Sequence, residues 1–163
     1  MNSEEITKAL NLEDIYLGQK FLSVAYAIPK AEMIDFARKY DPQIFHIDEN
    51  KAKDTFFQGI AASGWYTASI SMKLLVNSLP INGGLIGAGC EVNWPKPNRE
   101  NDILGLETEV IAIKPSKSKP DRGIVLIQRL TYNQNDEIVQ RLIPKIVVFK
   151  KKLWPDGCGH EII

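Results

Sequence analysis

An apolar segment at residues 63–78 constrains the fold more than any other feature of the sequence. A helix on a protein surface keeps its polar residues on one stripe, whereas a helix that is apolar on nearly all sides is buried. Apolar side chains surround the helix predicted here, and they are Trp65, Tyr66, Ala68, Ile70, Met72, Leu74, Leu75 and Val76. Between Trp65 and Val76 only Thr67, Ser69, Ser71 and Lys73 are polar. Such a helix has to be wrapped by other elements.

Strand-like segments after this helix supply the wrapping. They follow Gly83 and Gly84 and lie at residues 85–94, 103–113, 123–132 and 138–149. In the second of them apolar and polar residues alternate, which is typical of an antiparallel sheet with one buried face. Residues 133–136, Asn-Gln-Asn-Asp, predict a hairpin connection.

Shorter elements are predicted before the apolar helix. A strand is expected at residues 18–29, an amphipathic helix at 30–40 and a short helix at 48–55, for which Asp48 is a good N-cap. One strand, a buried helix and then four strands predict the α+β class, with one curled antiparallel sheet wrapped around one long central helix.

The length and the charge of the chain limit its organisation and its partners. We expect 163 residues to form a single domain, 1–163, with a core at about 14–150 and a C-terminal extension at 151–163. The 20 basic and 20 acidic side chains cancel, so we expect neither nucleic acid nor a membrane surface as a partner. The polar N-terminus and the lack of an apolar run of ~18 residues predict a cytoplasmic protein.

The two cysteines give no sign of a redox or metal site. Cys90 and Cys158 are far apart and have no Cys-x-x-Cys spacing, so we interpret both as structural or incidental. We expect no metal and no redox cofactor.

The candidate chemistry lies just before the apolar helix. Pro42 disfavours helical geometry at Asp41, so this carboxylate is expected just past the end of the helix at 30–40. His46 follows five residues later, and Gly64 opens the apolar helix 18 residues after it. An acid, an imidazole and a free backbone N–H can move protons beside a carbonyl and stabilise negative charge on its oxygen. The other histidine, His160, lies in the tail.

Each of these residues also has a structural interpretation. Asp41 would suit a turn after the helix, His46 a hydrogen-bonded position in the core, and Gly64 a crowded crossing of two backbones. Their joint spacing beside a buried helix favours the functional interpretation. Ser63 fits an N-cap better than a nucleophile, because no Gly-x-Ser-x-Gly elbow surrounds it.

Over roughly residues 14–150 the sequence resembles the MaoC-like dehydratases, the group that includes the (R)-specific enoyl-CoA hydratases. The residues that carry the resemblance are Asp41, His46, Asp48, Gly59-Ile60-Ala61-Ala62-Ser63 and Gly64. The sequence departs from the family motif at Gln43 and Ile44, where Asn and Pro are usual, and at Ser63, where His is common.

The resemblance implies a hot-dog fold, at least a homodimer, and an acyl-CoA hydratase or dehydratase. Such an enzyme adds water reversibly to a trans-2-enoyl-CoA and gives a 3-hydroxyacyl-CoA, with coenzyme A entering as part of the substrate. Asp41 and His46 would hold and deprotonate the water, and one of them would supply the α-proton. The N–H of Gly64 would face the thioester oxygen.

Further residues are candidates for binding the substrate. Ser63, Trp65 and Ser69 are candidates for the acyl pocket, with Trp94 as a wall, although core packing also explains Trp65 and Ser69. Three basic residues, Lys117, Lys119 and Arg122, are candidates for the phosphates of coenzyme A, although a solvated loop is the more ordinary explanation.

Two other functions stay open from the sequence. A hot-dog acyl-CoA thioesterase would use the carboxylate to activate water against the thioester carbonyl. A non-catalytic acyl-CoA-binding subunit would carry Gln43 and Ile44 as marks of an altered site. The sequence does not distinguish coenzyme A from acyl carrier protein as the carrier of the acyl group.

Overall fold

The computed structural model describes residues 9–152, so the predictions for Cys158 and His160 lie outside the described residues, and the C-terminal extension is described only as far as Lys152. The elements in chain order are η1 (Leu12–Asp14), β1 (Lys20–Leu22), β2 (Tyr26–Ala27), α1 (Lys30–Tyr40), α2 (Ile44–Ile47), α3 (Glu49–Ala52), α4 (Gly64–Ser78), β3 (Ile86–Asn93), β4 (Ile103–Pro115), β5 (Arg122–Tyr132) and β6 (Ile138–Phe149).

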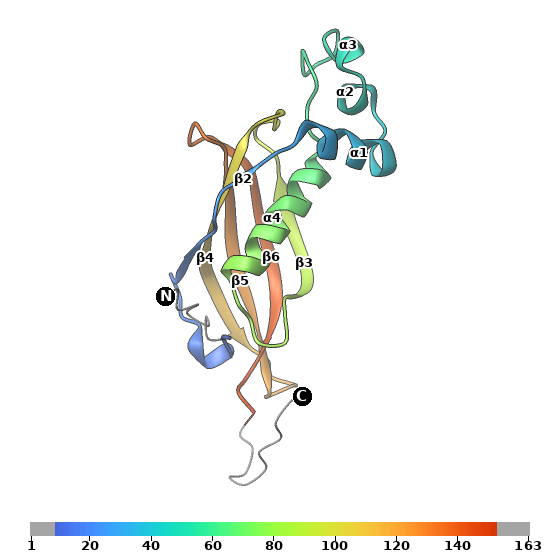
Figure 1. The fold of residues 1–163 in the computed structure, drawn as a ribbon. Helices are drawn as coiled ribbons and strands as arrows, with labels where there is room; N and C mark the ends of the chain where they lie inside the picture. Colours follow the sequence, from blue (N-terminus) through green and yellow to red (C-terminus); the bar gives the residue numbers. More distant parts are fainter. Residues whose placement is uncertain (1–8, 153–163) are drawn as a thin grey trace, which may run out of the picture.

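A single antiparallel sheet of six strands curves around α4, which confirms the predicted α+β architecture (Figure 1). The strand order is β1-β4-β5-β6-β3. Strand β2 also pairs with β4, at residues 103–104, on the same edge as β1. Three long strands, β4, β5 and β6, form the centre of the sheet. Strand β3 lies at one edge, and nearly all of its residues are exposed.

The strand predicted at residues 18–29 is interrupted, and the structure replaces it with the two short strands β1 and β2. The interruption lies at Ser23, whose hydroxyl accepts a hydrogen bond from the backbone N–H of Leu106 at 2.9 Å. A side chain therefore takes the place of a backbone acceptor in the ladder at this point.

The helical segment before α4 also differs from the prediction. Asp48 is an N-cap as expected, since its carboxylate accepts from the backbone N–H groups of Asn50 and Lys51. The helix that it starts ends at Ala52 rather than at residue 55, and turns follow up to Gly59, which has a φ of 146°. The four-residue helix α2, which carries His46, was not predicted, because a single turn leaves no periodic pattern.

Helix α4 has the predicted position, and Ser63 is its N-cap, since its hydroxyl accepts from the Trp65 N–H at 3.2 Å. A single chain does not bury this helix on all sides. The sheet covers one side only, and Trp65, Met72 and Val76 are 59%, 45% and 55% exposed. These residues and Ser69 form one stripe along the helix.

The concave face of the sheet, which packs against α4, changes character along its length. Near the β4–β5 hairpin its buried residues are apolar, namely Val110, Val125, Ile127 and Val148. Towards the end next to α1 four polar residues, Thr108, Arg129, Thr131 and Gln140, are buried beside apolar ones such as Leu106 and Leu142. The polar end lies next to the N-terminal half of α4, where the candidate site is found.

Candidate active site

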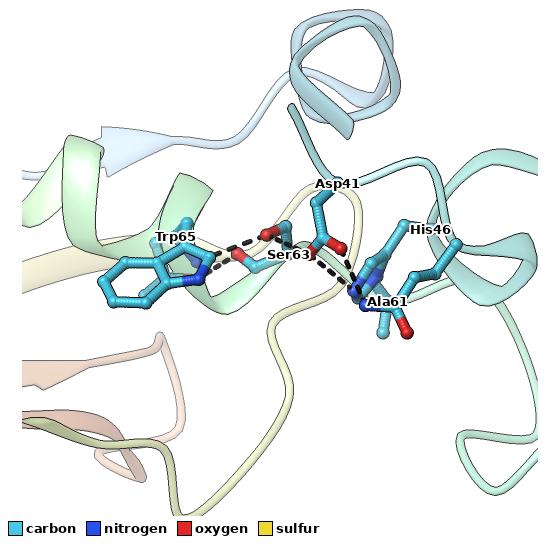
Figure 2. Close-up of polar contacts among 7 residues, drawn as sticks. Asp41, His46, Ala61, Ser63 and Trp65 are labelled. Atoms are coloured by element: carbon cyan, nitrogen blue, oxygen red, sulfur yellow. Dashed lines mark hydrogen bonds and ion pairs between the residues drawn. The ribbon is translucent and has the colours of Figure 1, made fainter. Parts of the chain in front are cut away.

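Asp41 stands at the end of α1, as Pro42 predicts. Its backbone N–H still donates to the Ala37 carbonyl at 2.8 Å, but its φ and ψ of −150° and 65° are no longer helical. Both carboxylate oxygens of Asp41 accept a hydrogen bond. Oδ1 accepts from Gln43 Nε2 at 2.7 Å. Oδ2 accepts from Ser63 Oγ, also at 2.7 Å (Figure 2). The carboxylate is therefore held in one orientation.

These contacts also set the ionisation of Asp41. Partial burial raises the pKa of the Asp41 carboxyl, while the hydrogen bonds from Ser63 and Gln43 and the nearby His46 lower it. The lowering effects prevail, so the pKa lies below its ordinary value. Asp41 is therefore a carboxylate at neutral pH.

His46 is buried in α2, and its ring is fixed from two sides. Nδ1 lies 2.8 Å from the carbonyl oxygen of Ala61. Because a carbonyl only accepts, Nδ1 carries the hydrogen of this bond. Phe45 packs edge-on against the imidazole with ring centroids 4.5 Å apart. The other nitrogen, Nε2, lies 3.3 Å from Asp41 Oδ2 (Figure 2).

This pair of atoms is suited to hold a water molecule. When His46 is neutral, its Nε2 is an acceptor beside a second acceptor, the Asp41 carboxylate. A water lying against both can donate one hydrogen to each, and its oxygen then carries lone pairs ready to attack. Once Nε2 has taken a proton, the imidazolium is a general acid beside the same carboxylate.

The pair faces a pocket of about 520 Å³ that also reaches the start of α4. Apolar side chains supply most of its walls, among them Phe45, Phe56, Phe57, Trp65, Trp94, Pro95 and Pro97. Gly64 lines the same pocket, and its N–H bonds to no other residue within 9–152. A free N–H at a helix start carries partial positive charge, which favours a negatively charged oxygen.

The residue at position 64 has to be glycine for a steric reason. A Cβ at this position would lie 2.8 Å from Cε2 of Trp94, because the indole packs directly against the backbone. Trp94 in turn contacts Trp65 edge-on, with ring centroids 5.3 Å apart. Both aromatic rings line the same pocket as Gly64.

Comparison with known proteins identifies the family. Residues 14–128 match the model of the MaoC like domain. This chain belongs to the MaoC-like family. The uncharacterised protein YdeM of Bacillus subtilis is 35% identical over 130 residues, covering 78% of this chain and 90% of YdeM.

Solved structures of this family share the fold. The MaoC-like dehydratase from Rhodospirillum rubrum is 51% identical with a TM-score of 0.87, covering 89% of this chain and all of that protein. The (R)-hydratase PhaJ1 from Pseudomonas aeruginosa is 22% identical with a TM-score of 0.73, covering 95% of this chain and 96% of that protein. These likenesses confirm the expected hot-dog fold.

The structure brings most of the predicted MaoC-like site together. One pocket is lined by Asp41, His46, Gly64 and Trp65. The hydroxyl of Ser63 donates a hydrogen bond to the Asp41 carboxylate. Ser69 does not line this pocket, because it lies on the exposed stripe of α4 and its hydroxyl donates to the Trp65 carbonyl at 2.9 Å.

The basic residues proposed for coenzyme A lie at the other end of the sheet. Lys117 and Lys119 are in the β4–β5 turn, and Arg122 begins β5, where it pairs with Asp121 at 2.8 Å. Strand β4 runs from this turn to the end next to α1, a distance of roughly 40 Å for its 13 residues. Within one chain these residues therefore do not reach the pocket, and their contact with substrate stays a prediction.

Sequence reasoning missed a residue that holds the loop over His46. The Arg99 guanidinium donates to the carbonyls of Phe57, Gly59 and Ile60 at 2.6, 3.0 and 2.8 Å. These residues precede Ala61, the hydrogen-bond partner of His46. No local pattern marks Arg99, since its three acceptors lie about 40 residues earlier in the chain.

Two further findings concern residues 9–152. No group of three or more His, Cys, Asp and Glu side chains within this range is arranged to hold a metal ion. No helix in the same range is long and apolar enough to cross a lipid bilayer.

Proposed function

We propose that this protein is an acyl-CoA hydratase and dehydratase that adds water to the double bond of a trans-2-enoyl-CoA. The observation that carries the proposal is the pairing of Asp41 Oδ2 and His46 Nε2 at 3.3 Å in the same pocket as the free N–H of Gly64. A relative with 51% identity, from Rhodospirillum rubrum, is a MaoC-like dehydratase, which supports the same class of reaction.

The geometry suits a stepwise or concerted addition. The thioester oxygen lies against the Gly64 N–H, and the water lies between Asp41 and His46. The water oxygen bonds to the β-carbon as His46 Nε2 takes one of its protons, and the electron pair of the double bond moves towards the thioester oxygen. The proton returns from His46 to the α-carbon, so that water has added across the double bond and the enzyme is restored.

The expected contributions are large enough to matter. Positioned acid–base groups typically contribute about 10² to 10⁴ in rate. Loss of one oxyanion donor costs about 2.7 to 4 kcal/mol. Neither term alone accounts for an efficient enzyme, so the proposal requires the pair and the Gly64 N–H to act on one substrate.

The departures from the family motif are compatible with a working site. Gln43 and Ser63 are the two side chains that donate to the Asp41 carboxylate. They therefore supply orientation and a low pKa to the residue that the reaction needs. This favours the enzyme over the alternative of a non-catalytic acyl-CoA-binding subunit.

The test is loss of the enoyl-thioester absorbance on adding the protein to a trans-2-enoyl-CoA. We expect turnover by the unchanged protein and little or none by Asp41→Asn or His46→Gln. Asp35→Asn is the matched control, since Asp35 is an exposed carboxylate on α1 that pairs with Arg38 and does not line the pocket, and it should retain full activity. Full activity in either site variant would contradict the assignment. Release of free thiol by the unchanged protein would instead identify a thioesterase.

We also propose that the protein forms a homodimer through β3 and the exposed stripe of α4. Strand β3 has an unpaired edge, and Trp65, Met72 and Val76 leave apolar surface beside it. Exposed edges and apolar stripes are usually covered by a partner. Two structures with the same fold are complexes, HadBC and ChsH1–ChsH2 of Mycobacterium tuberculosis. A monomer in light scattering would contradict the proposal.

A further inference from the structure

A buried polar cluster lies on the concave face of the sheet directly behind the pocket. Thr108 on β4 is paired with Arg129 on β5, and Thr131, two residues further along β5, is paired with Gln140 on β6. Ser71 of α4 packs onto them. All five are at most 1% exposed. A fully buried position normally holds an apolar residue, so four polar residues of the sheet and one of the helix in one place need an explanation.

Arg129 is the most unusual member of the cluster. It is 1% exposed, and its Nη2 donates to Ser71 Oγ, while its Nε has no partner. No carboxylate among residues 9–152 forms an ion pair with it. Burial lowers the pKa of the Arg129 guanidinium to about 10, against the smaller opposing effect of the nearby Cys90. At neutral pH it is therefore a buried cation without an anion, a costly arrangement.

Other polar atoms around Arg129 also have no partner. They are the hydroxyls of Thr108 and Thr131, both of them buried. Buried polar groups in native proteins nearly always have a hydrogen-bond partner. Arg129 thus lacks an anion, and the neighbouring hydroxyls of Thr108 and Thr131 lack an acceptor.

The cluster is connected to the wall of the pocket by hydrogen bonds. Thr67 and Trp94 line the pocket, and Ser71 is one turn further along α4 than Thr67, about 6 Å away. With its amide oriented to satisfy both ends, Gln140 accepts from Trp94 Nε1 at 3.0 Å and donates to Ser71 Oγ at 2.8 Å. One chain of hydrogen bonds therefore leads from the pocket wall to Arg129.

We propose that this cluster binds a carboxylate at the far end of the acyl group, so that the substrates are CoA thioesters of unsaturated dicarboxylic acids. Arg129 pairs with the carboxylate, the hydroxyls of Thr108 and Thr131 donate to it, and the acyl chain replaces the contact between Trp94 and Gln140. The inference rests on the proposed function, because Gly64 fixes the thioester end of the same molecule. A methyl-terminated chain of equal length leaves the guanidinium without an anion.

The experiment compares pairs of trans-2-enoyl-CoA thioesters of four, six and eight acyl carbons, one member ending in a carboxylate and the other in a methyl group. In at least one pair the unchanged protein should prefer the carboxylate in kcat/KM by on the order of 100-fold, as expected for a desolvated charge pair. Arg129→Met should lose this preference and should not melt at a lower temperature, because an apolar residue of similar volume replaces an unpaired buried charge.

Two further variants sharpen the result. Arg129→Lys keeps a cation and should keep part of the preference. Arg141→Met is the matched control, because Arg141 is exposed on β6 and donates to Gln128. It should leave both substrate series unchanged.

The outcomes separate this inference from the proposed function. Equal or better hydration of the methyl-terminated member in every pair keeps the proposed function and overturns the inference. A melting temperature that falls by several degrees in Arg129→Met assigns the arginine a structural role and also overturns it. Hydration of neither member contradicts the proposed function itself, and the binding preference for the same pairs, measured by calorimetry, then decides the inference.

Discussion

The two ends of the concave sheet face pack against the same helix but are built differently. Along β5 the buried residues Val125 and Ile127 are followed, on the same face, by Arg129 and Thr131. At the apolar end the buried side chains carry no polar atom that needs a partner. The polar end leaves a cation without an anion and two hydroxyls without partners, next to the pocket that contains Asp41 and His46. Departures from good packing of this kind are expected where a protein binds something.

The difference assigns separate roles to the two ends. Burial of apolar side chains stabilises the fold at about 25 cal/mol per Å² of area removed from water. Unpartnered polar groups oppose that stabilisation by about 1 to 3 kcal/mol each. We therefore expect substitutions at the apolar end to lower stability, and apolar substitutions in the polar cluster to change activity or selectivity without lowering stability.

The largest effect is expected when Asp41 and His46 are replaced together. Each single alanine variant should lower kcat by about 10² to 10⁴. Because both side chains act on one water, the double variant should lose little more than the worse single one. Initial rates of the three variants test this, and losses that multiply would show that the two residues act independently. Each variant should still unfold cooperatively, although the loss of the hydrogen bonds of Asp41 and His46 should lower the free energy of unfolding by about 1 to 3 kcal/mol.

At the apolar end, Ile127→Ala should lower the free energy of unfolding by about 2 to 5 kcal/mol, because it leaves a cavity in the core. The kcat of the remaining folded enzyme should be unchanged. Urea unfolding measures the effect, with Ile111→Ala as the control, since Ile111 is 37% exposed on β4. A large loss of kcat in the folded Ile127 variant would contradict the separation of roles.

Gly64→Ala tests the contact between α4 and the pocket wall. The added Cβ would lie 2.8 Å from Trp94, so the indole or the start of the helix must move. We expect kcat to fall by about 10²-fold, as for a misplacement of about 1 Å in an active site. Gly105→Ala is the control, because no atom lies within 4 Å of a Cβ at that position. Unchanged activity in Gly64→Ala would remove Gly64 from the mechanism.

The low pKa of Asp41 predicts a pH effect of defined sign. A lowered pKa means that folding favours the carboxylate, so its contribution to stability is complete above the ordinary value of about 3.9. It is lost as the pH falls through the lower pKa of the folded protein. The stability of the unchanged protein relative to Asp41→Asn should therefore decline below about pH 4. A relative stability that rises on acidification would contradict the assignment.

The smallest expected effect is at Thr131. Its hydroxyl is buried without a partner, and Thr131→Val replaces it with a methyl group of similar size. The free energy of unfolding should rise by about 1 kcal/mol. Urea unfolding is the measurement. A loss of stability would mean that the hydroxyl is satisfied in the folded protein.

The sequence predicted the parts of the site that depend on local rules. Pro42 placed Asp41 past the end of α1, and the apolar run placed Gly64 at the start of α4. The position of His46 relative to Asp41 followed from spacing and from the resemblance to a family. These positions could be predicted because each depends on residues close together in the chain.

Other features depend on contacts between distant strands and were not predictable. From the sequence alone, an arginine in the segment 123–132 is expected to be exposed. Only the structure shows that Arg129 lies beside Thr108 on the buried face of the sheet. The exposed stripe of α4 likewise depends on how far the sheet curls. Gln43 was noted only as a departure from the motif, and its bond to Asp41 required the structure.

Hydration in water enriched in oxygen-18 tests the central claim most directly. A trans-2-enoyl-CoA is incubated with the protein and the products are analysed by mass spectrometry. The account predicts a 3-hydroxyacyl-CoA that keeps its coenzyme A and carries one heavy oxygen on the β-carbon. Free coenzyme A with a labelled carboxylic acid, or unreacted substrate, would contradict it.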